Sequence, residues 1–161
     1  GNNVFLEPDR FDVDSFRFES LVEEGKANER HGNVKGALEH YKQAADLYKG
    51  DFLPEDLYLE RVCLKCDELR GKYIEVLLKT AKFYEQQGAL KKAINVYRKV
   101  IQKEPVAEEA CQRLMQLYAE QGKRNEALKA YKAFEQALQV ELNIPPDELT
   151  VMLYRKIRDS A

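Results

Sequence analysis

Hydrophobic residues recur along most of the chain with the period of an α-helix. Such spacing places apolar side chains on one face of each helix. Two segments, 49–54 and 143–147, interrupt the pattern because their Gly and Pro residues favour turns. The pattern therefore predicts an all-α protein. Before one glycine the spacing i, i+1, i+4 and i+7 is met by Leu77, Leu78, Ala81 and Tyr84, and before another by Leu114, Leu117 and Tyr118.

Three ten-residue stretches of the chain align without gaps, and two of them start 34 residues apart. Each has Gly, then Ala five residues on, then Tyr four residues later. Gly can end a helix in a left-handed turn, Ala allows two helices to approach closely, and Tyr covers the same face. Each unit is thus a predicted helix–turn–helix pair that must stack on neighbours. The repeat positions are Gly32, Ala37, Tyr41, Gly88, Ala93, Tyr97, Gly122, Ala127 and Tyr131.

This pattern resembles the tetratricopeptide repeat, which implies a right-handed α-solenoid. In that family the first helices of the repeats line a concave groove that binds peptides. By repeat position, the groove would present Lys26, Lys79, Lys82, Arg113 and Gln116. The Asn that some such repeats use to hold a peptide carboxylate is missing, so we do not predict that ligand. The alternative is that these residues form only a solvated helix face.

Further helices are predicted at the first repeat's start, in an insertion of 22 residues, and at the end of the chain. Asp14 or Ser15 can cap the first helix. The insertion, residues 52–73, predicts a long helix that starts near Pro54 and continues through Gly71 to Gln87. Asp147 caps a final helix, which would close the solenoid. The apolar side of that helix is predicted to hold Leu149, Met152, Leu153 and Tyr154.

Over residues 9–158 the chain resembles the bacterial transcriptional activator domain of SARP-type transcription regulators. The elements Gly50-Asp51-Phe52-Leu53 and Glu141-Leu142-Asn143-Ile144-Pro145-Pro146 carry the resemblance. It implies that residues 9–161 form a non-catalytic regulatory domain, which controls activation by an upstream DNA-binding domain. Residues 1–8 would be an extended tail, the last strand of a winged-helix domain missing from this excised fragment. Partners would be the transcription machinery, another domain of the regulator, or a second copy in a homodimer.

Charge changes sign along the chain of 161 residues, although the net charge is only −2. Residues 1–64 carry −6, residues 65–103 carry +6, and the rest carry −2. Opposite charges of this kind can steer self-association or a partner, or can vary by chance. The near-neutral total disfavours direct nucleic-acid binding. The basic segment includes Lys79, Lys82, Lys91, Lys92, Arg98, Lys99 and Lys103.

Residues able to carry out catalysis or bind metal are few. Cys63 and Cys66 form a single CxxC pair, whereas a structural zinc site needs four ligands. We therefore expect core packing for them and for Cys111, with a redox pair or a metal site as alternatives. Neither His31 nor His40 has a plausible nucleophile and acidic partner. The sequence predicts no enzyme activity, cofactor or metal.

The composition bears on where the protein acts. The longest apolar run has four residues, far below the ~20 of a membrane span. The odd cysteine count and the lack of a signal peptide lead us to expect a cytoplasmic protein. An alternative function is a free-standing tetratricopeptide-like scaffold that binds an acidic or helical peptide in an unrelated assembly.

Overall fold

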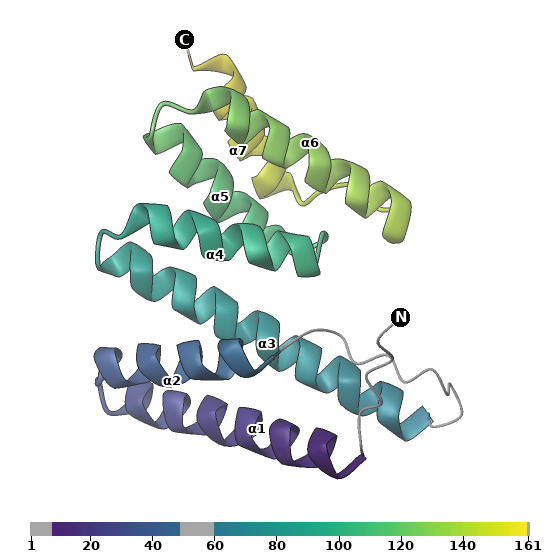
Figure 1. Ribbon diagram of the computed structural model, residues 1–161. Coiled ribbons are helices and arrows are strands. Elements are labelled where there is room, and N and C mark those ends of the chain that lie inside the picture. The colour runs from purple at the N-terminus through teal and green to yellow at the C-terminus, as the bar shows by residue number, and fades with distance from the viewer. Residues whose placement is uncertain (1–7, 49–59, 161) are drawn as a thin grey trace, which may run out of the picture. The chain divides into compact units, whose positions relative to one another are not determined.

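The computed structural model describes residues 8–48 and 60–160 of the chain. Within these two stretches every regular element is an α-helix, which confirms the predicted all-α fold. None of the helices described is long and apolar enough to cross a lipid bilayer. Figure 1 labels the helices, which are α1 (Pro8–Arg30), α2 (Val34–Leu47), α3 (Glu60–Gln86), α4 (Leu90–Lys103), α5 (Glu108–Glu120), α6 (Arg124–Glu141) and α7 (Glu148–Asp159).

The chain divides into two compact units, one ending at Thr80 and the other beginning at Ala81. Helix α3 contributes to both, because it is unbroken from Glu60 to Gln86. Its continuity through Gly71 confirms the predicted long helix. The predicted start of that helix, near Pro54, lies outside the described residues.

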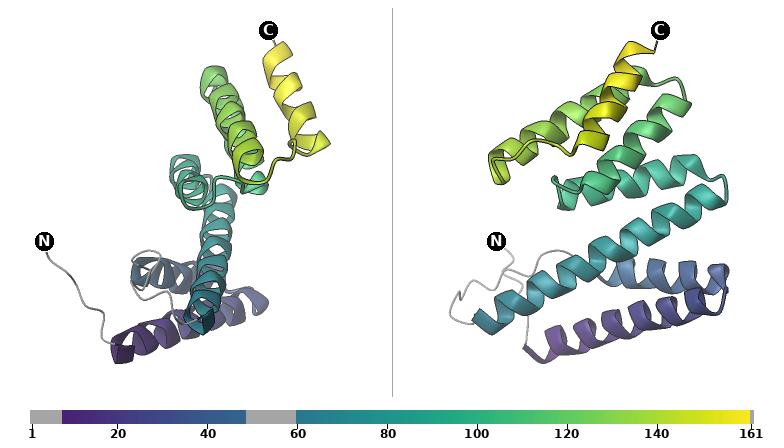
Figure 2. Two further views of the ribbon diagram at one scale, coloured as in Figure 1. Left: turned by 90° about the vertical axis from the view of Figure 1, so that its right-hand side faces the viewer. Right: turned by 180° about the vertical axis from the view of Figure 1, so that it is seen from behind.

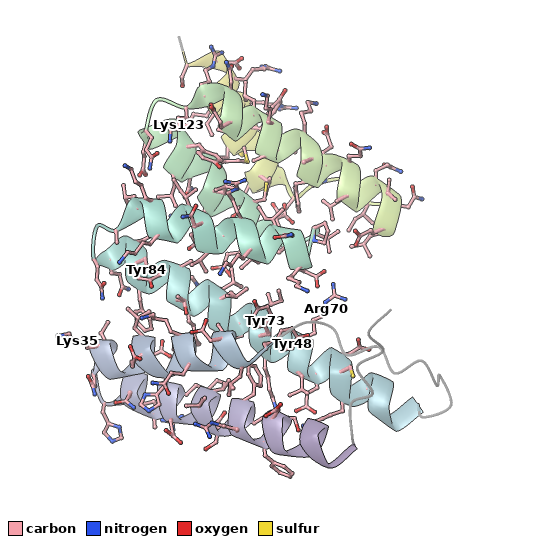
Figure 3. All side chains as sticks on the ribbon, viewed as in Figure 1. Lys35, Tyr48, Arg70, Tyr73, Tyr84 and Lys123 are labelled. Carbon is pink, nitrogen blue, oxygen red and sulfur yellow. The ribbon has the colours of Figure 1, made fainter. Side chains whose placement is uncertain are left out.

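In the first unit, α1 and α2 form an antiparallel pair (Figures 1 and 2). The two helices come close because Gly25 has no side chain: a Cβ there would lie 2.4 Å from Cε1 of Tyr41. The Tyr41 ring is fully buried. The middle of α3 contributes Tyr73, whose ring stacks on Tyr48 with centroids 4.1 Å apart (Figure 3).

Each helix pair is joined by a turn of the same geometry. Gly32, Gly88 and Gly122 have φ values of 71°, 69° and 71°, the left-handed conformation that favours glycine. The amide of the following residue then donates to the carbonyl five residues earlier, at 2.8 Å in all three turns. This bond satisfies a carbonyl at the end of the first helix. All three glycines of the predicted repeat therefore lie at the turn between two helices.

In the second unit, α5 packs against α4, α6 and α7. The core of this unit is formed by Cys111, Met115, Ala127, Tyr131, Phe134, Leu138 and Ile157. Cys111 is fully buried, as predicted, and burial raises the pKa of its thiol to about 12. Cys66 is half-buried, and the side chain of Cys63 lies outside the described residues.

The ends of two helices differ from the sequence predictions. Helix α1 begins at Pro8, so the predicted cap at Asp14 or Ser15 is wrong. Pro suits the first turn of a helix, since its missing N–H would have no partner there. Pro8 is also the last residue of the predicted tail, whose residues 1–7 lie outside the described residues.

Helix α7 begins after Asp147, as predicted, and the carboxylate of Asp147 accepts the Leu149 amide at 2.7 Å. Its predicted apolar side is wrong for Leu149 and Met152, which are exposed. Thr150 and Ile157, seven residues apart on one face, are buried instead. Burial of Thr150 is possible because its hydroxyl donates to Glu108 Oε1 at 2.5 Å.

Candidate functional site

A partly buried network links three helices in the first unit. The hydroxyl of Tyr41 on α2 donates to Glu29 Oε2 on α1 at 2.9 Å, and Lys79 Nζ on α3 donates to the same oxygen at 2.6 Å. The pKa of Glu29 is lowered: burial opposes the shift, but the hydrogen bonds from Lys79 and Tyr41 outweigh it. Burial and the Glu29 carboxylate raise the pKa of Tyr41. Carboxylate, phenol and ammonium therefore fasten the helices together. We call this arrangement a Glu–Tyr–cation clamp.

The second unit repeats the clamp at the same positions of the repeat. The Tyr97 hydroxyl on α4 donates to Glu85 Oε1 at 2.5 Å. Arg113 on α5 donates to both carboxylate oxygens of Glu85. The hydrogen bond to Glu85 raises the pKa of the Arg113 guanidinium. In both units the Glu lies three residues before the turn Gly, the Tyr nine residues after it, and the cation nine residues before the next turn Gly.

The third repeat lacks this clamp. Ala119 occupies the position of the carboxylate, three residues before Gly122. The Tyr131 hydroxyl donates instead to Glu135 Oε1 on its own helix at 3.0 Å. Burial and Glu135 raise the pKa of Tyr131 to about 12, and its ring stacks on Tyr154 of α7 with centroids 4.1 Å apart. The third tyrosine is thus held by α7 rather than by a carboxylate of α5.

The lysines predicted to line a basic groove are bound to carboxylates of their own unit. Lys26 lies 3.5 Å from Glu23 and 3.4 Å from Glu75. Lys79 is part of the first clamp, and Lys82 pairs with Glu109 at 2.6 Å. Much of the positive charge that the sequence places at these three positions is therefore neutralised locally.

Arg113 and Gln116, the two other predicted groove residues, line a groove between α5 and α7 of about 660 Å³. Arg113 Nη1 donates to Gln116 Oε1 at 2.7 Å, which fixes both side chains. The groove is placed beside Ala119, where a carboxylate is missing. We call it the α5–α7 groove, and its lining comprises Arg113, Gln116, Ala119, Glu120, Arg124, Leu153, Lys156, Ile157 and Ser160, of which Glu120 is acidic.

Lys156 gives the α5–α7 groove a cation that is available to a ligand. It is exposed and has no carboxylate partner within residues 8–48 and 60–160. A second cation, Arg124, is held in place because its guanidinium donates to the carbonyls of Ile157 (3.0 Å) and Arg158. With Leu153 and Ile157 as its apolar part, the groove can bind a segment that carries both a carboxylate and an apolar side chain.

The sequence prediction missed the clamp carboxylates and Lys156. The spacing of Glu29 and Glu85 from the turn Gly was a usable signal, since it is the same in two repeats. Lys156 had no such signal, because its place depends on how α7 packs against α5. A groove residue of that kind is found only once the capping helix is positioned.

The residues suited to catalysis are engaged in structural contacts. Nδ1 of His31 donates to the Ala27 carbonyl, and Nδ1 of His40 donates to the Gly36 carbonyl, both at 2.7 Å. Nε2 of His40 lies 3.0 Å from Glu24. Among the residues that the structure describes, no group of three or more His, Cys, Asp or Glu side chains is placed to hold a metal ion.

Comparison with known proteins gives one family and a common fold. The sequence model of the bacterial transcriptional activator domain matches residues 13–158. The TPR2B domain of yeast Sti1, solved in complex with pHsp70, superposes with a TM-score of 0.62 at 16% identity, covering 91% of this chain and 99% of that one. A C-terminal TPR-containing domain of a putative FK506-binding protein of Plasmodium falciparum has the same TM-score at 18% identity, covering 91% of this chain and 89% of that one.

A third solved structure, the Sgt2 TPR domain from Aspergillus fumigatus, has a TM-score of 0.56 at 16% identity and covers 88% of this chain and 76% of that one. At these identities the likeness concerns the fold alone. It confirms the tetratricopeptide-like arrangement of helix pairs.

Proposed function

Because the chain belongs to the bacterial transcriptional activator domain family, we propose that it is the non-catalytic interaction domain of a transcription regulator. Its contacts with protein, inside the regulator or with another molecule, decide whether an attached DNA-binding domain activates transcription. The observation that carries this proposal is the family match, which spans almost all of a fold built from stacked helix pairs. Such folds present extended surfaces for binding.

The α5–α7 groove is the part of the predicted partner surface that best fits this role. Lys26, Lys79 and Lys82 each bind a carboxylate of their own unit, so an acidic partner would have to displace it. Lys156 needs no such exchange. Gln116 beside it adds a side-chain amide, whereas Arg113, like those lysines, is already paired with a carboxylate, that of Glu85. We therefore propose that this groove binds an acidic segment of the partner.

The yeast Sti1 domain supports a protein ligand for this fold, since its structure is a complex with pHsp70. The net charge of −2 argues in the same direction, because proteins that bind DNA through its phosphates generally expose a basic surface. The proposed division of labour leaves DNA binding to another domain of the regulator and protein contact to this one.

The test is an in-frame deletion of residues 13–158 from the regulator's gene. We expect target transcripts to fall while chromatin immunoprecipitation still finds the regulator at its promoters. Unchanged transcript levels would contradict the proposed role, and would favour a free-standing scaffold in an unrelated assembly.

Single substitutions test the groove itself. Lys156→Glu should lower activation of a target-promoter reporter, because it repels an acidic segment. Arg155→Glu is the matched control: Arg155 is the exposed neighbour on α7 and does not line the groove. Equal activation by the two variants would show that the α5–α7 groove is not the contact surface.

A further inference from the structure

We infer that a second groove, between α4 and α6 on the second unit, binds an acidic amphipathic segment of a protein partner. The inference rests on the proposed interaction role but concerns a different surface. The α5–α7 groove is formed by one first helix, α5, together with the capping helix, whereas this groove lies between two second helices. We call it the α4–α6 groove, and its volume is about 980 Å³.

The floor of the α4–α6 groove is apolar. Leu114 and Tyr118 of α5 lie at its base, with Ile101 from α4. Leu114 is 4% exposed, and Ile101 and Tyr118 are partly buried against the core of the unit. Because these side chains already pack against the core, they offer a rigid surface for an aliphatic or aromatic side chain of a ligand. A rigid surface loses little conformational entropy when the ligand binds.

Small residues on α6 keep the groove open. Ala130 is half-buried and Ala133 is exposed, and both line the wall. Larger side chains at these two positions would occupy the space between the helices. The volume of this groove lies at the upper end of the range of about 300–1,000 Å³ that is typical of ligand pockets. It is open to solvent, which suits a peptide segment better than an enclosed small molecule.

The rim of the groove carries three cations that no carboxylate of residues 8–48 and 60–160 neutralises. Arg98 and Lys99 on α4 and Lys129 on α6 are exposed, and none has an ion-pair partner among the described parts of the chain. This differs from Lys26, Lys79 and Lys82, which are all paired. Glu126 is the one acidic residue of the lining. The rim therefore attracts negative charge, and it does so without breaking an intramolecular bond.

Floor and rim together identify the kind of ligand. A partner helix with carboxylates on its flanks and an apolar residue at its centre satisfies both at once. Nucleic acid would use the cations but would leave the apolar floor unfilled, and the phosphate backbone would meet only three of them. Electrostatic complementarity at a rim mainly raises the association rate and makes it salt-dependent, while the apolar anchor sets the dissociation rate.

The test uses the 161-residue chain and two fluorescein-labelled synthetic peptides. One is a helix-forming acidic peptide with Leu and Phe on one face and Glu on the flanks, and the other has Lys in place of every Glu. Fluorescence anisotropy measures affinity, and amide chemical shifts locate the contact. We expect the acidic peptide to bind, to perturb the amides of α4 and α6 that line the groove, and to weaken with salt. The Lys peptide should bind about tenfold more weakly or worse.

Charge-reversal variants separate the groove from the general field of the protein. The triple variant Arg98→Glu, Lys99→Glu, Lys129→Glu should weaken the acidic peptide about tenfold or more. The control reverses three exposed cations outside the groove, Lys91→Glu, Lys123→Glu and Arg155→Glu, and should leave most of the affinity. Equal losses in the two variants would overturn the inference, as would chemical-shift changes confined to the α5–α7 groove.

A second pair of variants tests the floor without changing charge. Ala133→Trp should fill the groove and reduce binding, whereas Gln136→Trp, at an exposed position of α6 outside the lining, should not. Both side chains replaced are exposed, so thermal melting should be near that of the parent. Unchanged binding by Ala133→Trp would contradict the inference, as would a single-stranded oligonucleotide that competes as well as the acidic peptide.

The outcome is distinguishable from that of the proposed function. Deleting residues 13–158 measures the role in activation, and peptide binding measures the groove. If deletion abolishes activation while the groove triple variant binds the acidic peptide like the parent, only the groove inference fails. If the peptide binds as expected and deletion leaves transcripts unchanged, only the proposed function fails.

Discussion

Both units hold their helices together with a Glu–Tyr–cation clamp at the same three repeat positions, but the cation differs between them. In the first unit Lys79 completes the clamp around Glu29, and its ammonium lies 5.8 Å from the centre of the Tyr41 ring. In the second, Arg113 uses its planar guanidinium to reach both oxygens of Glu85 and also Gln116. A guanidinium can do this because its donors are arranged as a fork, whereas an ammonium acts as a point charge.

The units also differ beneath the buried ring. Tyr41 lies directly on Gly25, where even a methyl group would lie 2.4 Å from the ring. In the second unit Ala81 occupies the equivalent position and is fully buried. The comparison shows that the clamp fixes the hydroxyl of each tyrosine, while the residue under the ring sets how closely the helices approach. Four predictions test the close contact between the helices of a pair and the clamp separately.

The largest effect is expected at the alanines where the helices of a pair meet. Ala93→Asp or Ala127→Asp should cost about 4 kcal/mol or more of folding free energy, because a larger, charged side chain would be buried without a partner. Both alanines are fully buried. Ala133→Asp, at an exposed position of α6, is the control and should change stability little. Urea unfolding followed by circular dichroism measures both, and a normal midpoint for Ala93→Asp or Ala127→Asp would contradict the packing described.

Gly25→Ala should cost about 2 kcal/mol, because the added methyl group must push a buried ring away from its hydroxyl partner. Gly71→Ala makes the same change at a helical position with nothing within 4 Å of the new Cβ. It should stabilise the first unit by about 0.5–1 kcal/mol through helix propensity. Thermal melting of the two variants should therefore shift in opposite directions. A shift of the same sign in both would show that the ring does not rest on Gly25.

Glu85→Ala should cost about 1–2 kcal/mol, because it leaves the hydroxyl of fully buried Tyr97 and the Arg113 guanidinium without their shared acceptor. The Glu85 side chain is only 11% exposed. Glu135→Ala removes the corresponding acceptor of Tyr131, but Glu135 is more exposed and lies on the same helix, so a smaller loss is expected. Denaturant midpoints compare the two. Equal losses would mean that the clamp adds nothing beyond one hydrogen bond.

The smallest predicted effect is on the folding stability at acidic pH. The pKa of Glu29 is lowered, with burial outweighed by the bonds from Lys79 and Tyr41. Its contribution to stability is therefore complete above the ordinary glutamate pKa of about 4.3 and is lost as pH falls through the lower folded value. Glu29→Gln should flatten the fall in stability between about pH 5 and pH 3. Glu141→Gln, at the exposed end of α6, should not, and identical slopes would contradict the clamp's ionic character.

The turn and the buried positions could be predicted from the sequence because they depend on short-range rules. A glycine at φ near 70° and an alanine at a helix contact leave a fixed spacing, and that spacing occurs three times. Helix ends were harder to predict. Asp14 and Ser15 have good capping side chains, but the helix had already begun at Pro8.

The candidate site was only partly predictable, because it depends on pairs of side chains far apart in sequence. The sequence shows that Lys79 and Lys82 are basic, but not that Glu29 and Glu109 lie beside them. On α7, Leu149 and Met152 follow the expected apolar spacing, yet Thr150 takes the buried position because Glu108 and Gln112 supply its hydrogen bonds. Polar partners of this kind have no periodic signal.

Chemical labelling of the buried Cys111 thiol can report how often the second unit opens. Its Sγ lies 3.7 Å from Met115 Sδ and 3.8 Å from the Ala130 carbonyl, with no exposed surface. With a pKa of about 12, almost none of it is thiolate at neutral pH, and the thiolate is the form that reacts. In a variant in which Cys63 and Cys66 are replaced by Ala, a disulfide reagent can reach sulfur only when α5 and α6 separate. The labelling rate then measures how often these helices separate. A peptide bound in the α4–α6 groove should lower that labelling rate.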